Sequence, residues 1–270
     1  MTLFLALAIC TFAAIFFWRR HTAQKQRDLL QSRLSDAQHT LISRHVPMID
    51  KLPPETRVKL DGKIALFLDQ VDFGGCNGLD VTDEMRLSIA AQACLLVVNT
   101  DLWYGNLTTI LIYPSAFKSK NITHDGRVVR EAETVRLGES WSGGPVILSW
   151  ADSAQGALNN DDGHNVVLHE FAHQIDDMTG KTNGIPVLPD GQSLAEWGRV
   201  MAAAFERHSS DTQAGRKTVI DPYGATGYEE FFATSVEVFF EKPEQFKRDE
   251  PQVYAQLAAL FNLDPATWDA

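Results

Sequence analysis

Hydrophobic side chains open this chain of 270 residues as one uninterrupted block. Residues 1–18 carry no charge and would form a helix about 27 Å long at about 1.5 Å per residue, close to the roughly 30 Å core of a bilayer. No basic residue precedes the block, and aromatic residues lead directly into Arg19 and Arg20, unlike a cleaved secretory signal. The positive-inside rule then predicts a transmembrane anchor over residues 1–20 in the inner membrane, with the remaining chain in the cytoplasm. The membrane would be a partner of this helix; a buried core helix and an uncleaved export signal are the alternatives.

The next segment has few hydrophobic positions. Residues 21–50 are polar and rich in helix-forming residues, which predicts a solvated linker helix. The pair Pro53-Pro54 then favours the start of a new helix, because proline is tolerated in the first turn and cannot continue an earlier helix. These patterns divide the chain into an anchor, a linker helix and one domain over residues 51–270.

Inside this domain the hydrophobic pattern alternates between helical and extended segments. Apolar residues at near-helical spacing predict a helix over 57–71, and small and aliphatic residues on most faces predict a deeply buried helix over 84–98. Short apolar runs at 107–113 and 146–150 predict strands. A few strands among helices, followed by a helical C-terminal part, predict an α+β fold with a small mixed sheet.

Composition excludes several classes of protein. A hydrophobic content of 44 % with 22 % charged residues indicates a folded chain rather than a disordered one. The net charge of −11 argues against direct nucleic-acid binding, which needs basic residues to neutralise phosphates. Three cysteines without a CxxC pattern argue against a disulfide scaffold and against a cysteine metal site.

One short pattern points to chemistry: His169-Glu170-Phe171-Ala172-His173, an HExxH sequence. Residues four apart share one face of a helix, so His169 and His173 could bind a single ion, and imidazole nitrogens suit Zn²⁺. Glu170 could then accept a proton from a metal-bound water as general base. Two surface histidines on an ordinary helix are the simpler alternative, but the pattern directly continues the apolar run 166–168, which favours a buried, functional helix.

A catalytic zinc ion needs a third protein ligand, and the residues just after the pattern contain no histidine. A second predicted helix, over 227–241, offers four glutamates. Glu230 and Glu237 share one helical face with small residues, so either could bind the metal while the other holds an imidazole N–H. Glu229 and Glu241 are better explained as residues of a solvated face, and spacing alone does not choose the ligand.

Three blocks of sequence together resemble a known family: HEFAHQIDD, GPVILSW and DPYGATGYEEFFATSVEVFF. They are similar to the Mlc titration factor A family of bacterial zinc-dependent peptidases, gluzincins whose catalytic domain resembles that of anthrax lethal factor. The resemblance covers about residues 50 to 265. It implies a zincin-like metallopeptidase domain that binds one zinc ion through His169, His173 and Glu230.

The same resemblance implies the remaining roles in the site. Glu170 would be the general base, and Tyr223 would donate a hydrogen bond to the oxyanion formed on the scissile carbonyl. The strand at 146–150 would be an edge strand on which an extended peptide pairs antiparallel. Position alone, and not the resemblance, suggests a role for Asp176: three residues after the second histidine and on the same side of the helix, it could anchor the helix, orient a ligand or be an ordinary acid at the helix end.

Two kinds of partner are therefore expected. The first is a peptide or protein substrate, hydrolysed at the metal. The second belongs to an alternative function, a regulatory protein that sequesters a transcriptional repressor, because the family is named for sequestering the glucose repressor Mlc. An acidic body would attract a basic DNA-binding domain, although acidic surfaces also serve solubility alone.

Overall fold

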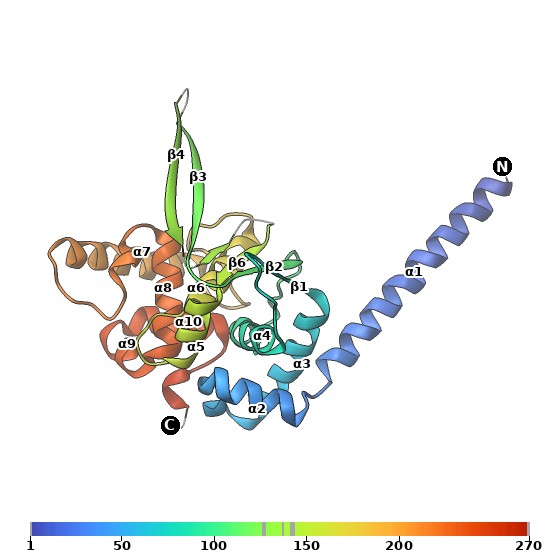
Figure 1. The fold of residues 1–270 in the computed structure, drawn as a ribbon, viewed down its shortest axis with the longest axis horizontal. Coiled ribbons are helices and arrows are strands. Elements are labelled where there is room, and N and C mark those ends of the chain that lie inside the picture. Colours follow the sequence, from blue (N-terminus) through green and yellow to red (C-terminus); the bar gives the residue numbers. More distant parts are fainter. Residues whose placement is uncertain (1, 126–127, 137, 141–143, 269–270) are drawn as a thin grey trace.

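The first helix stands away from the rest of the molecule in the computed structural model, which describes residues 2–125, 128–136, 138–140 and 144–268 (Figure 1). This helix, α1 (Thr2–Leu30), joins the apolar block to several turns of polar and charged residues. Among the residues described, no helix combines the length and the apolar character that crossing a membrane requires. The predicted transmembrane anchor is therefore wrong, and so is the predicted inner-membrane location with a cytoplasmic catalytic domain.

The segment predicted as one solvated linker helix is divided between two helices. The last turn of α1 packs on α3 (Pro54–Gln70), where a Cβ on Gly62 would lie only 2.1 Å from the carbonyl oxygen of Leu30. The chain then turns into α2 (Asp36–His45), whose residue Ile42 is buried. Glycine at position 62 thus allows the two backbones to touch. The C-terminal end of α1 and the helix α2 belong to the packed fold, whereas the rest of α1 projects from it (Figure 1).

Four short strands form one mixed sheet in the order β1-β2-β6-β5. The strands β1 (Asp72–Gly75), β2 (Thr109–Tyr113) and β6 (Val146–Ser149) are parallel, and β5 (Gly138–Ser140) is antiparallel to β6. The predicted α+β class is confirmed. The predicted edge strand is wrong, because β6 lies between β2 and β5, and the edge belongs to the three-residue strand β5.

A second, two-stranded sheet projects from the body as a hairpin (Figure 1). Its strands β3 (Phe117–Asp125) and β4 (Val128–Arg136) pair antiparallel along their whole length. Their sequences are polar, so the hydrophobic pattern did not predict them. The hairpin leads directly toward the edge strand β5.

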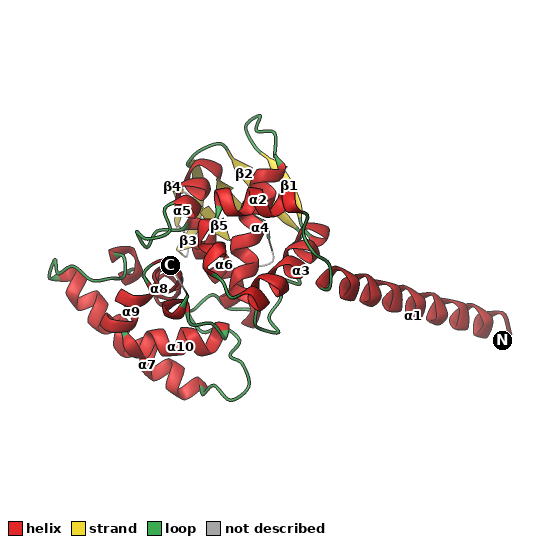
Figure 2. Cartoon of the chain, turned by 90° about the horizontal axis from the view of Figure 1, so that it is seen from below, coloured by secondary structure: helices red, strands yellow, loops and turns green. Residues whose placement is uncertain are grey.

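Helices make up the rest of the fold (Figure 2). They are α4 (Asp83–Val97), α5 (Trp150–Leu158), α6 (Val166–Asp176), α7 (Leu194–Gln213), α8 (Tyr228–Glu241), α9 (Pro243–Asp249) and α10 (Pro251–Phe261), with 3₁₀ turns η1 (Pro47–Lys51), η2 (Asp177–Thr179), η3 (Pro222–Ala225) and η4 (Pro265–Thr267). The helices predicted over 57–71, 84–98 and 227–241 correspond to α3, α4 and α8, each within three residues of the predicted ends. Both α4 and α8 are buried along most of their length, and α6 packs against both.

Candidate metal centre

The helix that carries the HExxH pattern, α6, is held at its start and along its core-facing side. Asn165 caps it, because the side-chain Oδ1 accepts hydrogen bonds from two backbone N–H groups of the first turn, both at 3.1 Å. Phe171, inside the pattern, is fully buried among aromatic rings of the core, a contribution of about 1.5–3 kcal/mol to stability. His169 and His173 lie on the opposite side of the helix from Phe171 and therefore face α8.

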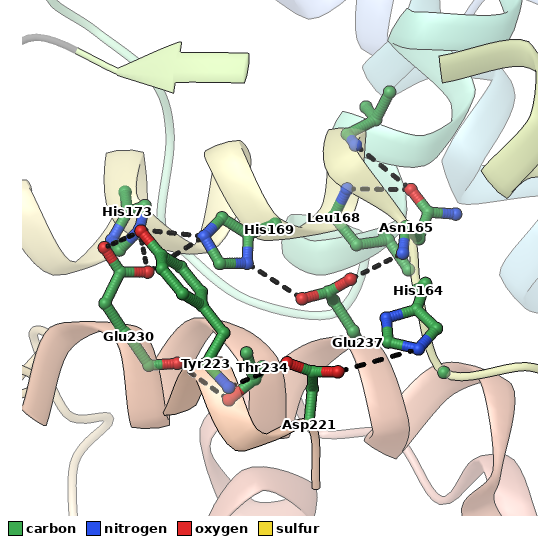
Figure 3. Close-up of polar contacts among 12 residues, drawn as sticks. His164, Asn165, Leu168, His169, His173, Asp221, Tyr223, Glu230, Thr234 and Glu237 are labelled. Carbon is green, nitrogen blue, oxygen red and sulfur yellow. Dashed lines mark hydrogen bonds and ion pairs between the residues drawn. The ribbon is translucent and has the colours of Figure 1, made fainter. Parts of the chain in front are cut away.

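Three side chains meet between α6 and α8 (Figure 3). His169 Nε2 lies 3.1 Å from Glu230 Oε2, His173 Nε2 lies 3.4 Å from the same oxygen, and the two nitrogens are 3.2 Å apart. A tetrahedral zinc site with bonds of about 2.0–2.1 Å places neighbouring ligand atoms about 3.3 Å apart. The three atoms therefore form a triangle of the size that one zinc ion requires.

The charges in this triangle also fit a cation. Burial by itself would lower the pKa of His169, but its hydrogen bonds to Glu230 and Glu237 outweigh burial and raise that pKa well above the usual value. Burial would raise the pKa of Glu230, yet its contacts with both histidines hold it far below the usual range. Glu230 Oε2 is buried, and the polar atoms beside it are the two imidazole nitrogens. A metal ion would satisfy this oxygen and replace a proton on the imidazoles.

Glu237 is placed on the other side of the same imidazole ring. Its Oε1 lies 2.8 Å from His169 Nδ1, and its Oε2 accepts a hydrogen bond from the backbone N–H of Asn165 at 2.5 Å. Because Nδ1 must carry the proton in this contact, Nε2 keeps its lone pair for a metal. Spacing left Glu230 and Glu237 open as ligands; the structure puts Glu230 against both Nε2 atoms and Glu237 behind one ring.

Glu241 extends the row of carboxylates on α8, and its interpretation as a solvated residue is wrong. The side chain is only 5 % exposed and accepts hydrogen bonds from the backbone N–H of Gly163 at 3.0 Å and from Asn165 Nδ2 at 3.1 Å. Burial raises the pKa of Glu241 to about 8, and the nearby carboxylates of Glu237 and Asp162 add to this effect. Glu241 thus supports the residue that caps the metal-facing helix.

The raised pKa of Glu241 predicts a dependence of stability on pH. Between its ordinary pKa of 4.5 and the folded value of about 8, the folded chain keeps a proton that the unfolded chain releases. This contribution is complete below the lower value and is lost as the pH rises through the upper one. Relative to the Glu241→Gln variant, the metal-free wild type should therefore lose roughly a few kcal/mol of unfolding free energy across this range.

Urea unfolding of both proteins at a series of pH values measures this difference. Glu229→Gln serves as the matched control and should keep the pH dependence of the wild type. Parallel curves for the wild type and Glu241→Gln would show that Glu241 holds no such proton.

Glu170 lies on α6 beside the ligands and is only 5 % exposed. The edge strand β5 runs directly against it: a Cβ on Gly138 would lie 2.5 Å from Glu170 Oε1 and 2.6 Å from its Cγ. Contacts this short are impossible for any side chain at position 138 without a shift of Glu170 or of the strand. The general base predicted from sequence is therefore covered by backbone of the sheet edge.

Tyr223 approaches the triangle from the turn η3. Its hydroxyl donates a hydrogen bond to Glu230 Oε1 at 3.1 Å, and its ring lies 6.1 Å from the ring of His169 (Figure 3). The side chain is half exposed, at 50 %. Asp221 caps the turn by accepting a hydrogen bond from the Tyr223 backbone N–H at 2.7 Å. Tyr223 thus reaches the site from a surface turn, which spacing in the sequence did not indicate.

Asp176 anchors the chain that follows the metal-facing helix. It is fully buried, and its carboxylate accepts hydrogen bonds from the backbone N–H groups of Gly184 at 2.6 Å and Ile185 at 2.9 Å. Of the roles considered from sequence, anchoring is the one that these contacts support.

Two contributors to the site escaped the sequence analysis for different reasons. Asn165 had a readable signal, because asparagine directly before an apolar helical run is a strong N-cap. Gly138 had no signal, because it lies in a strand of three residues without a hydrophobic pattern.

The chain is similar to a family of metallopeptidases and to several known proteins. A family model described as glucose-regulated metallo-peptidase M90 matches residues 18–262. An uncharacterised protein of Synechocystis sp. is 42 % identical over 244 residues, which cover 89 % of each chain. Mlc titration factor A of Klebsiella pneumoniae is 31 % identical over 225 residues, or 82 % of this chain and 84 % of the relative. Mlc titration factor A of Escherichia fergusonii is 29 % identical over 225 residues, with the same coverage.

The family match spans most of the chain and includes every residue of the candidate site. It confirms the resemblance to Mlc titration factor A that the three sequence blocks indicated. A metallopeptidase family implies a metal, and His169, His173 and Glu230 are the described residues close enough together to hold one. The chain belongs to the glucose-regulated metallopeptidase M90 family.

Proposed function

We propose that this protein is a zinc-dependent peptidase of the gluzincin type, with one zinc ion per chain bound by His169, His173 and Glu230. One observation carries the proposal, namely that the three ligand atoms lie 3.1–3.4 Å from one another. Two imidazole nitrogens and one carboxylate oxygen are also the donor set of a common type of catalytic zinc site. The metallopeptidase family of the chain supports the same function.

The chain's own residues divide the chemistry among them. A zinc ion at this site would supply Lewis acidity and lower the pKa of a water to about 7. Glu170 takes a proton from the attacking water and delivers it to the leaving amine. Tyr223 donates a hydrogen bond to the oxygen of the scissile carbonyl as negative charge develops there. Glu237 keeps the proton of His169 on Nδ1 and fixes the orientation of the ring.

The edge strand β5 supplies a place for the substrate. A strand at a sheet edge carries unpaired backbone groups, and an extended peptide can pair with them. Because Gly138 lies directly against Glu170, a peptide on this edge would bring its backbone close to the general base. We therefore infer that the substrate is a peptide or protein segment bound in an extended conformation.

The contact between β5 and the general base makes Gly138→Ala a sharp test of this arrangement. The added methyl group requires either Glu170 or the strand to shift, which changes the position of the general base relative to a peptide on β5, so kcat should fall about 10- to 100-fold while the bound zinc is unchanged. Gly198→Ala in α7 is the matched control, because a Cβ there meets no atom within 4 Å, and it should behave like the wild type. Steady-state kinetics and metal analysis measure both effects. Unchanged kinetics in Gly138→Ala would remove the proposed role of the strand.

A screen for cleavage tests the proposed function itself. The zinc-loaded full-length protein is incubated with a peptide library, and products are identified by mass spectrometry. We expect cleavage by the wild type and none by His169→Ala, which loses a ligand. Absence of cleavage by the zinc-loaded wild type, or equal cleavage by His169→Ala, would contradict a peptidase that depends on this site.

A second candidate function is sequestration of a transcriptional repressor. It is favoured by the relatives called Mlc titration factor A, a name that describes binding rather than hydrolysis. Such binding would engage the repressor protein, in keeping with the absence of direct nucleic-acid binding expected from the net charge of −11. A pull-down with purified Mlc-type repressor separates the two functions, since sequestration alone should survive the His169→Ala substitution.

A further inference from the structure

The turn that carries Tyr223 is held between two helices, although the tyrosine side chain itself is half exposed. On the α8 side, Gly224 lies so close to Thr234 that a Cβ would be 2.5 Å from the Thr234 hydroxyl oxygen. That hydroxyl donates a hydrogen bond to the backbone carbonyl of Glu230 at 2.7 Å. The turn is therefore in contact with the first two turns of α8, which also carry the glutamate of the metal centre.

On the α7 side, the turn is held by a buried histidine. His208 is only 3 % exposed, and its Nε2 lies 3.0 Å from the backbone carbonyl oxygen of Asp221. A carbonyl oxygen only accepts, so Nε2 must be the donor. The other nitrogen, Nδ1, lies 3.2 Å from the Thr218 hydroxyl, which is also 2.7 Å from the carbonyl oxygen of Ile220. His208 thus binds the chain on both sides of the bend that leads into η3.

The Asp221 residue links this histidine to the tyrosine. Its carbonyl accepts from His208, and its side chain accepts from the Tyr223 backbone N–H at 2.7 Å. Because the Tyr223 side chain is half exposed, the position of its hydroxyl depends on the backbone that carries it as well as on its contacts with His169 and Glu230. To act on a substrate bound at the metal centre, the Tyr223 hydroxyl must stay close to the three ligands; in the structure it lies 3.1 Å from Glu230 Oε1.

We propose that His208 is a positioning residue for Tyr223: by donating a hydrogen bond to the Asp221 carbonyl, it fixes η3 so that the tyrosine hydroxyl reaches the reacting carbonyl. The role rests on the proposed peptidase function. His208 contacts the turn through Asp221, and its ring also lies 5.7 Å from the ring of Phe231, which follows Glu230 on α8. The experiments must therefore separate an effect through Tyr223 from an effect through α8.

Two substitutions of His208 distinguish the effect of its hydrogen bond to the Asp221 carbonyl from the effect of replacing the histidine ring. In His208→Gln the amide nitrogen reaches approximately the place of Nε2 and keeps the donor. In His208→Asn the shorter side chain reaches only the place of Nδ1. Using the zinc-loaded full-length chain, we expect His208→Asn to lower kcat about 10- to 100-fold, with KM and zinc content unchanged, and His208→Gln to restore most of the rate.

A double-mutant cycle shows whether the effect passes through Tyr223. In a Tyr223→Phe background, His208→Asn should lower kcat no further, because the hydroxyl that it positions is gone. Thr218→Val removes the hydroxyl that contacts Nδ1 of His208, and it should lower kcat less than His208→Asn does. In the Tyr223→Phe background it should have no effect. This variant replaces His208→Asn in the cycle if His208→Asn does not fold. An equal loss of kcat in both backgrounds, or no loss in either, would overturn the proposal.

Hydrogen–deuterium exchange gives a readout that needs no activity. The backbone N–H groups of Tyr223, Gly224 and Thr226 are all hydrogen-bonded within the turn. Their exchange should become faster in His208→Asn and stay unchanged in His208→Gln, while exchange in α6 stays unchanged in both. If the wild type cleaves no peptide, the proposed function fails but exchange still tests the positioning; unchanged exchange in His208→Asn would overturn the positioning alone.

Discussion

Replacing Glu170 by glutamine should reduce kcat/KM for peptide hydrolysis by about 10²- to 10⁴-fold, the usual contribution of a general base. Glutamine has the same shape and preserves packing against Gly138, but it cannot take a proton from water. Glu170 is not one of the three residues of the ligand triangle, so one zinc ion per chain should remain bound. Initial rates together with metal analysis of the purified variant measure both quantities.

Glu196→Gln is the control for this substitution, because Glu196 lies on the surface of α7 in an ion pair with Arg199. It should leave both the rate and the zinc content unchanged. Full hydrolytic activity in Glu170→Gln would exclude Glu170 as the base. Loss of zinc from that variant would instead make the glutamate a metal ligand and contradict the assignment of the triangle.

The second large effect concerns zinc affinity. Glu230→Gln should lower the zinc affinity by more than the roughly 10- to 100-fold that substitution of an outer residue costs, because it replaces a ligating carboxylate by a neutral amide. Glu237→Gln should lower the zinc affinity within that range of roughly 10- to 100-fold, since Glu237 contacts the ligands only through Nδ1 of His169. Glu229→Gln, next to the ligand in sequence, should bind zinc like the wild type.

Competition with a coloured chelator measures these affinities in parallel. We expect the largest loss of zinc affinity in Glu230→Gln, a smaller loss in Glu237→Gln and none in Glu229→Gln. A larger loss in Glu237→Gln or Glu229→Gln than in Glu230→Gln would assign the third ligand to another residue.

The local sequence pattern predicts the site correctly where the geometry depends on a single helix. The HExxH spacing places His169 and His173 on one face of any helix, and the structure brings their Nε2 atoms to 3.2 Å. Glu230 and Glu237 are separated by two turns on a common face, so periodicity treats them alike. Only the packing of α6 on α8 distinguishes them, by placing one at Nε2 and the other at Nδ1.

The errors arose where one segment was interpreted without its neighbours. Glu241 ends a helix rich in apolar residues, and its burial depends on Asn165 and Gly163 from a distant segment. The strand β5 has three residues and no pattern of its own, so β6 was assigned the sheet edge. The apolar block at the N-terminus continues into polar turns of the same helix, which the hydrophobic pattern of the block does not contain.

Tyr223 shows what family resemblance adds to residue-level reasoning. Spacing alone marks it only as a residue after Pro222, whereas the resemblance predicted a role at the oxyanion. In the structure its hydroxyl lies 3.1 Å from Glu230, and the turn that carries it is contacted by both α7 and α8. These contacts come from residues far apart in sequence, which no local pattern contains.

Titration of the metal-depleted wild type with zinc, followed by the rate of peptide hydrolysis, tests the central claim most directly. We predict that activity returns in proportion to added zinc and reaches its maximum at one ion per chain, while Glu230→Gln requires much more zinc to show any activity. Hydrolysis that persists after complete metal removal, or a zinc-saturated wild type that cleaves no peptide, would contradict a peptidase built on His169, His173 and Glu230.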